Sequence, residues 1–391
     1  MSSKIPFLSE TAKIFIKRIA QHFKEGFELF KTDRSIQTSE IYTNETTHLK
    51  RGEKYTHINS QIRNSIESSC WIGQTLTFNI HSKKITVHLV HPCSSVHKDS
   101  KKISLFFKKI EIQIFAWLYV ASLESEKGCS TDLSIYIYFT DFKKTLPPVK
   151  KTPLDEINVN TGFTFSCKLT SSGENEMYIY RKEEWFKVLI HESFHAFSLD
   201  YLGLSSEVIE NIDRKVVQLF PLHINLRYYE SYCEMWAELL QIIYMNWEEL
   251  SQNEKPLWLK FERMLKIDQK HSVKQAVKIL KQQHICYSDL FEKSNKSQLK
   301  RMEYREVSPV FSYYLIKSIF YMHIGRYIEW TSINNKGTLR FQKSEHSVNS
   351  YVELLRQMYQ SPKFIEEIKS CEKTIKIDGG ENNLRMSYWQ A

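Results

Sequence analysis

Glycine and proline are scarce in this chain, which contains 11 and 9 of them among 391 residues. This scarcity excludes collagen-like and linker-rich architectures and favours long regular elements. Long apolar runs are missing as well. The most apolar stretch, residues 110–121, contains Glu111 and Gln113, and no stretch reaches the roughly 20 apolar residues that a membrane-spanning helix needs. Because the first ten residues also lack the pattern of a signal peptide, we expect an intracellular protein without a transmembrane segment.

The cysteines have no recognisable pairing pattern. There are seven of them, which is an odd number, their spacings are wide and no CxxC pair occurs. Such usage is typical of a reducing compartment, in which cysteine serves as a small hydrophobic residue. We expect this role for Cys70, Cys93, Cys129, Cys167, Cys233, Cys286 and Cys371.

Several function classes lack their motifs. No GxGxxG or GxxxxGK[ST] loop occurs, which argues against a nucleotide cofactor, and no GxSxG nucleophile elbow is present. The net charge of +9 is small for a chain of this length and is weak evidence for an anionic partner. A lysine stripe on a predicted helix is best interpreted as a solvated face, so we do not expect nucleic acid as a partner. The stripe consists of Lys266, Lys270, Lys274, Lys278 and Lys281.

The order of predicted elements indicates an α+β core followed by a mostly helical C-terminal lobe. We expect an N-terminal helix and loop-rich extension at 1–65, the core at 66–250 and the lobe at 251–391. Hydrophobic periodicity predicts helices at 11–31 and 103–123, from about 182, at 226–245 and over most of 256–369; it predicts a hairpin at 74–91 and strands at 133–139, 162–166 and 177–180.

One segment carries recognisable chemistry, the HExxH motif formed by His191, Glu192 and His195. Residues four apart share a helix face, so both histidines can bind one ion. Imidazole nitrogen suits Zn²⁺, and Glu192 can reach a water on the metal without being a ligand. The flanking residues are apolar, as a buried metal-binding helix requires. We expect the strand at 177–180 to be the edge strand that holds substrate beside this helix.

A third zinc ligand is needed, because catalytic zinc usually has three protein ligands. Position 201, where some HExxH enzymes place a third histidine, is Tyr201, and Asp200 qualifies only if the helix ends sharply. A downstream helical segment is the better source, since it carries Glu230, Glu234 and Glu238 at four-residue spacing among apolar residues. Carboxylates in so apolar a helix are costly unless they are paired or bound to metal.

HExxH followed some 35–40 residues later by a helical glutamate resembles the gluzincin metallopeptidases. In many of these the ligand glutamate opens an ExxA(D/E) pattern, which residues 234–238 match well and residues 230–234 match in a shifted register with Cys233. The resemblance therefore implies a zincin-like core, a small mixed sheet with an HExxH helix and a glutamate helix. It implies Glu234 as the third zinc ligand, with Glu230 as the alternative and the neighbouring acid orienting a ligand histidine.

More narrowly, residues 181–195 and 230–237 look like metallopeptidases encoded by large DNA viruses. This resemblance covers about 120–245 and implies a viral protein in the host cytoplasm or the virion, acting on a peptide or protein substrate.

The parts predict a hydrolase in which Glu192 is the general base that passes a proton from water to the leaving amine. An oxyanion stabiliser has to come from elsewhere. The rival hypothesis is a viral structural or partner-binding protein that keeps a zincin fold without catalysis; the intact Glu192 argues against it. Candidate oxyanion stabilisers are Tyr313, Tyr314 and His323, each also interpretable as a helix-core residue.

Overall fold

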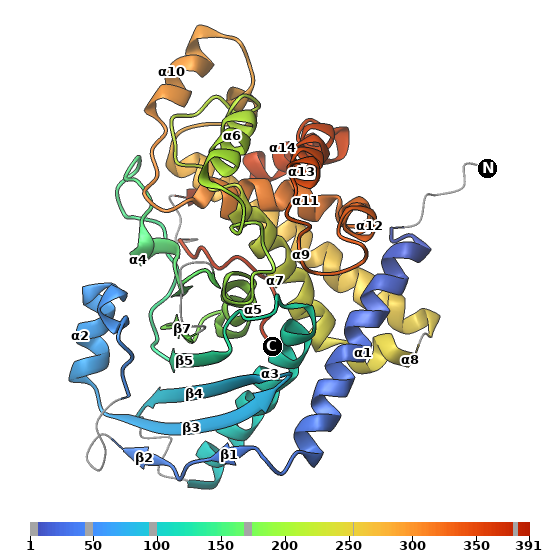
Figure 1. Cartoon of the computed structure of the whole chain (residues 1–391). Helices are drawn as coiled ribbons and strands as arrows, with labels where there is room; N and C mark the ends of the chain where they lie inside the picture. The colour runs from blue at the N-terminus through green and yellow to red at the C-terminus, as the bar shows by residue number, and fades with distance from the viewer. Residues whose placement is uncertain (1–6, 44–49, 94–99, 168–173, 253, 378–381) are drawn as a thin grey trace. The chain divides into compact units, whose positions relative to one another are not determined.

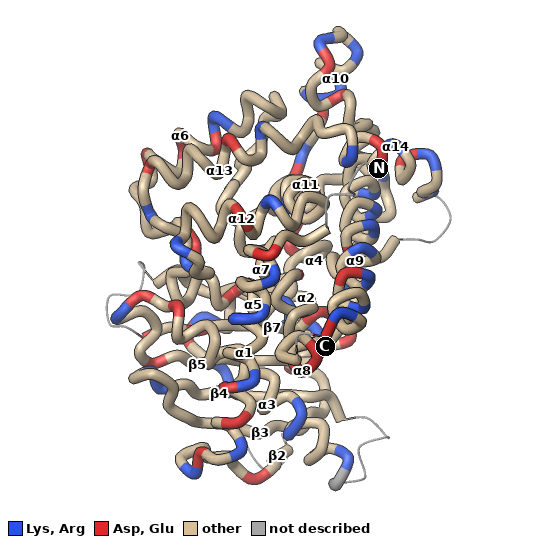
Figure 2. The backbone as a smooth tube through the Cα atoms, turned by 90° about the vertical axis from the view of Figure 1, so that its right-hand side faces the viewer, with Lys and Arg blue, Asp and Glu red and all other residues tan. Residues whose placement is uncertain are grey.

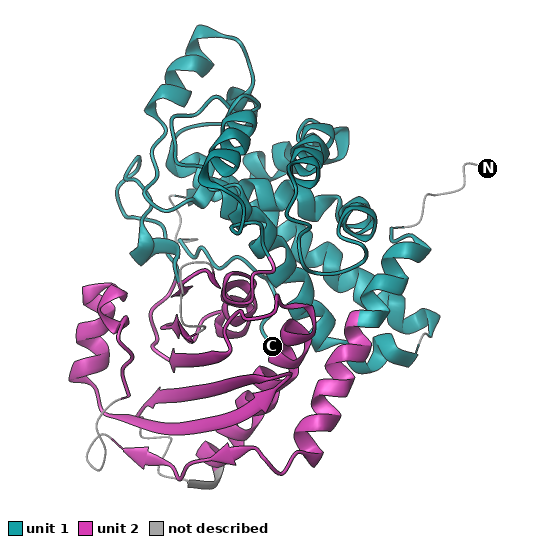
Figure 3. Ribbon diagram, viewed as in Figure 1, with its two compact units in different colours: residues 1–18, 144–160, 200–391 teal, residues 19–143, 161–199 magenta. Residues whose placement is uncertain are grey.

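The computed structural model describes residues 7–43, 50–93, 100–167, 174–252, 254–377 and 382–391. The chain forms two compact units (Figure 3): unit 1 comprises 1–18, 144–160 and 200–391, and unit 2 comprises 19–143 and 161–199. Each unit combines segments that are distant in sequence. The predicted boundaries at residues 65 and 250 instead divide the chain into three consecutive parts. The expected α+β class is confirmed, with a small mixed sheet and a mostly helical C-terminal part.

The sheet lies in unit 2 and its strand order is β1-β3-β4-β5-β7-β6, with β2 also paired to β3 (Figure 1). β3 and β4 form the predicted hairpin, whose turn residues His81 and Ser82 have φ of 46° and 67°. β4, β5 and β7 are parallel to one another, and β6 is antiparallel to β7. The strands are β1 (Gln37–Thr38), β2 (Tyr42–Thr43), β3 (Trp71–Ile80), β4 (Lys83–Pro92), β5 (Asp132–Tyr138), β6 (Gly162–Thr164) and β7 (Glu174–Ile179).

The expectation that the strand near 177–180 is an edge strand is wrong. β7 pairs with β5 on one side and with the three-residue strand β6 on the other, so β6 ends the sheet. The local pattern around Met177 predicts a strand correctly, but it contains no information about how many neighbours that strand has.

An aromatic row crosses four strands of unit 2. His88, Tyr136, Tyr178 and Phe163 occupy directly opposite positions on β4, β5, β7 and β6, and consecutive rings stack with centroids 4.8–4.9 Å apart. Cross-strand pairs of stacked rings like these stabilise the register of the strands. Because side chains alternate between the faces of a sheet, the sequence neighbours of these four residues project from the opposite face.

Helices α3 and α5 cover the sheet within unit 2. α3 connects parallel strands β4 and β5, as parallel pairing requires, and it contacts both β3 and α5. Phe115 of α3 packs on Phe78 of β3, and Trp117 packs on Phe194 of α5. The helices carrying residues of unit 2 are α1 (Glu10–Thr32, from residue 19), η1 (Tyr55–His57), α2 (Ser60–Ser68), α3 (Ser100–Glu124) and α5 (Trp185–Ala196).

Unit 1 is mainly helical, as predicted for the C-terminal part. Its longest helix, α9, contacts α7, α11 and α14, and Tyr351 lies in a cluster of aromatic rings that includes Tyr228 and Phe320. Among the described residues, no helix combines the length and apolarity that crossing a bilayer requires. The helices are α4 (Glu156–Val159), α6 (Ser206–Val217), α7 (Tyr229–Met245), α8 (Trp247–Gln252), α9 (Lys255–Gln282), η4 (Tyr287–Leu290), α10 (Asn295–Glu303), the π-helical η5 (Phe311–Ile316), α11 (Lys317–Met322), α12 (Ile324–Asn334), α13 (Glu345–Met358) and α14 (Pro362–Thr374).

The expectation that all seven cysteines serve as small hydrophobic residues is wrong for four of them. Disulfides join Cys70 to Cys93 and Cys129 to Cys167, both within unit 2. Cys233 and Cys371 are free and buried, as expected, and Cys286 is free and exposed. The sequence separations of 23 and 38 residues are closed by the folding of the sheet, which the cysteine spacing does not reveal.

Candidate metal centre

The HExxH motif lies on α5, and every residue of that helix is buried. The helix begins at Trp185 rather than near Lys182, because Glu184 adopts a left-handed conformation (φ 60°) at the N-cap. Within unit 2, α5 packs against α3, β6 and β7. The helix is therefore held on several sides by its own unit, as the apolar residues around the motif predict.

The residues between the two histidines fix the rotation of α5 about its axis. Ser193 accepts a hydrogen bond from Trp117 Nε1 (3.0 Å) and donates one to Leu189 O (2.6 Å). Phe194 stacks on Trp117 with ring centroids 6.4 Å apart. Because Ser193 lies about half a turn from the histidines, these contacts direct His191 and His195 to the opposite face of the helix.

The histidine pair has a separation that suits one shared ion. The Nε2 atoms of His191 and His195 are 3.3 Å apart, and the ring centroids are 5.1 Å apart. Two nitrogens that each lie about 2.05 Å from a tetrahedral Zn²⁺ are separated by about 3.3 Å. A single hydrogen bond between one protonated and one bare nitrogen gives the same separation. The geometry therefore fits the metal, and a metal measurement separates the two interpretations.

Glu192 lies beside the edge strand of the sheet. Its side chain is buried, with 7 % exposed, and Gly162 of β6 passes close to it. A Cβ at Gly162 would lie 2.6 Å from Tyr178 O, 2.8 Å from Val188 Cγ1 and 3.5 Å from Glu192 Cγ. Only glycine allows this approach. The only sequence signal for this contact is the glycine that opens the predicted strand at 162–166.

The motif does not continue along α5, because the helix ends at Ala196. Tyr201 and Asp200 lie beyond this end and belong to unit 1. Tyr201 is a buried core residue whose ring contacts Phe341. Asp200 Oδ1 accepts a hydrogen bond from Leu202 N at 3.1 Å. The ending is sharp, which is the condition under which Asp200 stays a candidate ligand.

The predicted glutamate helix is α7 of unit 1, and Glu230, Glu234 and Glu238 lie on successive turns of it. All three are buried. Glu238 forms an ion pair with Lys317 (Nζ–Oε1 2.5 Å), and Lys317 also donates to Ser272 Oγ. The charge of Glu238 is therefore balanced within unit 1, which leaves Glu230 and Glu234 as the candidate ligands of this helix.

Two of the three oxyanion candidates have their polar atoms engaged in unit 1. Tyr314 OH donates to Leu384 O at 2.8 Å. Both ring nitrogens of His323 have partners, Ile319 O and Ser361 Oγ, each at 2.8 Å, and burial lowers its pKa. These contacts agree with the helix-core interpretation. Tyr313, on the π-helical segment η5, is only half-buried.

The lysine stripe lies along α9 (Figure 2). Lys278 is buried and donates to Asn383 O, and Lys281 donates to Ile375 O. Lys266 lies over the ring of Phe7 at 4.8 Å. Since these three lysines contact non-helical residues of their own unit, part of the stripe is engaged within the protein and the stripe is not simply a solvated face.

In comparisons with known proteins, the chain matches no family model, no curated protein and no solved structure.

Proposed function

We propose that this protein is a zinc-dependent metallopeptidase in which His191 and His195 bind the metal and Glu192 is the general base. The observation that carries this proposal is the 3.3 Å separation of the two Nε2 atoms on a fully buried helix. Two imidazoles buried side by side with a carboxylate between them in sequence are costly for a structural helix. A shared metal ion offsets this cost.

A carboxylate of α7 supplies the third ligand in this proposal. Glu234 is the first candidate, because the ExxA(D/E) spacing begins there, and Glu230 is the alternative one turn earlier. The ion pair of Glu238 with Lys317 accounts for the third acid of the row and leaves these two glutamates as the candidates. The remaining acid would orient a ligand histidine.

The chemistry would be hydrolysis of a peptide bond. When bound, Zn²⁺ lowers the pKa of a water towards neutral and polarises a carbonyl. Glu192 accepts the proton of the attacking water and delivers it to the leaving amine. The absence of a side chain at Gly162 lets the strand backbone pass close to the Glu192 side chain.

Metal analysis tests the ligand set. Elemental mass spectrometry of the purified full chain should find one zinc per chain. Of the two variants Glu234→Gln and Glu230→Gln, one should lose this zinc and the other should retain it. Glu248→Gln, an exposed glutamate of α8, is the matched control. Folded wild-type protein without zinc, or zinc retained when His191 and His195 are both replaced by Ala, would overturn the proposal.

Activity is tested with the general base. Cleavage of a diverse peptide mixture, read by mass spectrometry, should fall by about 10²–10⁴-fold in Glu192→Gln, while zinc stoichiometry stays at one. Equal cleavage by wild type and Glu192→Gln would show that the activity belongs to a contaminant. Retained zinc with no cleavage of any peptide by the wild type would favour the structural or partner-binding alternative.

A further inference from the structure

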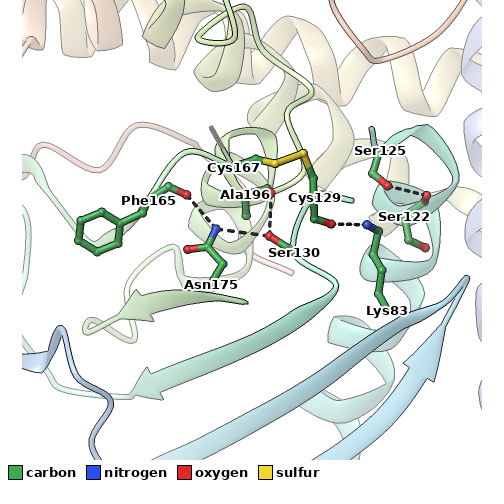
Figure 4. Close-up of a disulfide and its surroundings, with 9 residues drawn as sticks. All are labelled: Lys83, Ser122, Ser125, Cys129, Ser130, Phe165, Cys167, Asn175 and Ala196. Carbon is green, nitrogen blue, oxygen red and sulfur yellow. Dashed lines mark hydrogen bonds between the residues drawn. A yellow bond between two sulfur atoms is a disulfide. The ribbon is translucent and has the colours of Figure 1, made fainter. Parts of the chain in front are cut away.

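A buried hydrogen-bond network meets the C-terminal end of α5 in unit 2 (Figure 4). Ser130 Oγ donates to Ala196 O at 2.7 Å, and Ala196 directly follows His195. Asn175 Nδ2 donates both to Ser130 Oγ (3.3 Å) and to Phe165 O (2.8 Å). The network thus connects the segment before β5, the segment after β6 and strand β7 to the end of the helix that carries the histidines.

Ser130 completes the hydrogen bonding of this helix end. The last carbonyls of a helix have no partner inside it and need one elsewhere. Three of these carbonyls accept from amides that follow the helix, and a fourth depends on the Ser130 hydroxyl. Phe197 N donates to Ser193 O, Leu199 N to Phe194 O and Ser198 N to His195 O.

Ser130 is itself held by its neighbours. It is fully buried and has φ of 47°, a left-handed conformation that is unfavourable for a residue other than glycine. The Cys129–Cys167 disulfide joins the residue before Ser130 to the segment that follows β6. Lys83 Nζ donates to Cys129 O and lies 5.4 Å from the ring centroid of Phe197, so it connects the residue before Ser130 to the residue that follows α5.

We infer that Ser130 is a positioning residue for His195 and that the Cys129–Cys167 disulfide fixes Ser130. The inference rests on the proposed function, because it assigns the network to the metal-binding helix. His195 is the last residue but one of α5. A looser last turn displaces its Nε2 relative to that of His191, while His191, one turn earlier, keeps its place. A metal site tolerates little such displacement.

The test compares metal binding by Ser130→Ala with metal binding by a control variant in which a matched serine of the same segment is replaced. Ser125→Ala is the control, because Ser125 Oγ donates to Ser122 O and to no residue of α5 among the described contacts. Zn²⁺ affinity is measured by competition with a chromogenic chelator. Co²⁺-substituted protein reports the ligand geometry through its visible spectrum, which a general loss of stability does not shift.

We expect Ser130→Ala to bind Zn²⁺ about tenfold more weakly than the wild type, as for other groups that orient metal ligands, and to have an altered Co²⁺ spectrum. Ser125→Ala should match the wild type in both. The double variant C129S/C167S should weaken binding in the same direction, and C70S/C93S, which removes the other disulfide, should not. Circular dichroism of the metal-free proteins checks that each variant is folded.

The inference is overturned if folded Ser130→Ala binds Zn²⁺ and Co²⁺ as the wild type does, or if Ser125→Ala and C70S/C93S weaken binding equally. If C129S/C167S does not fold, Ser130→Ala alone decides, because it deletes a single oxygen. Failure of the proposed function looks different: the wild type itself then binds neither Zn²⁺ nor Co²⁺.

Discussion

The Nε2 atoms of His191 and His195 lie 3.3 Å apart on a helix that is buried along its whole length. Two features of unit 2 produce this relationship. The four-residue spacing places both rings on one face, and the hydrogen bond from Trp117 to Ser193 anchors the opposite face. The resulting pair of nitrogens has the spacing of two ligands on one tetrahedral ion.

Metal removal should destabilise the protein through this pair. A ligand that binds only the folded state at about 1,000 times its dissociation constant adds about 4 kcal/mol of stability. Chelation of the wild type should therefore lower its melting temperature in differential scanning calorimetry, and added Zn²⁺ should restore it. His195→Ala should show neither effect. An equal response in His195→Ala would mean that the metal binds elsewhere.

Substitution of Gly162 by Ala should destabilise unit 2 through crowding. The new Cβ would lie 2.6 Å from Tyr178 O and 2.8 Å from Val188 Cγ1, and overpacking of this kind costs about 1–3 kcal/mol. Chemical denaturation measures the loss. Gly128→Ala is a useful comparison, because Gly128 has φ of 86° and open space around it. The stability lost in Gly128→Ala therefore reports backbone strain without crowding. Wild-type stability in Gly162→Ala would contradict the close packing of β6 on α5.

The Lys317–Glu238 pair should be strongly coupled. Both side chains are almost fully buried, with 1 % and 0 % exposed, so replacing one partner leaves a buried charge and costs about 3–5 kcal/mol. We expect Lys317→Met and Glu238→Leu each to destabilise unit 1, and the double variant to recover much of the loss. Urea denaturation of the four proteins closes the cycle. Additive losses in the double variant would show that the two charges do not stabilise each other.

The same variants bear on the metal site. Because Glu238 is assigned to Lys317, folded Glu238→Leu/Lys317→Met protein should keep one zinc per chain in elemental analysis. If the folded double variant lost zinc, this result would identify Glu238 as a ligand.

Glu306 should make stability depend on pH. Burial raises its pKa to about 8, although Tyr304 OH and Phe311 N both donate to Oε2. Between about pH 4.5 and 8 the folded state therefore holds a proton that the unfolded state has lost, so stability falls as pH rises, by at most about 1.4 kcal/mol per pH unit. Glu306→Gln keeps the acceptor and cannot ionise. Its advantage over the wild type should grow from pH 5 to pH 8.

Glu303→Gln is the control for this pH series. The hydrogen bond from Lys151 lowers the pKa of Glu303, so its contribution changes below pH 4.5 and leaves the window above that value unaffected. Thermal melts across pH 5–8 should show parallel curves for Glu303→Gln and the wild type. Parallel curves for Glu306→Gln as well would contradict the raised pKa.

Local patterns predicted the long elements of the fold well. The apolar periodicity of residues 11–31 corresponds to α1, and the alternation around 74–91 corresponds to β3 and β4. The short elements were harder: β7 was recognised as a strand, but its neighbour β6 removes it from the sheet edge. Strand order depends on contacts between distant segments, which periodicity does not contain.

His191, Glu192 and His195 could be predicted as one group from their order in the chain, because a helix translates their spacing directly into geometry. The distant groups that support this helix are known only from the folded structure. It brought Cys129 to Cys167, placed Ser130 under Ala196 and set Gly162 beside Glu192. Each of these contacts joins residues that are about 30 or more positions apart. Such contacts form only when the sheet and its helices pack together, and no local pattern records them.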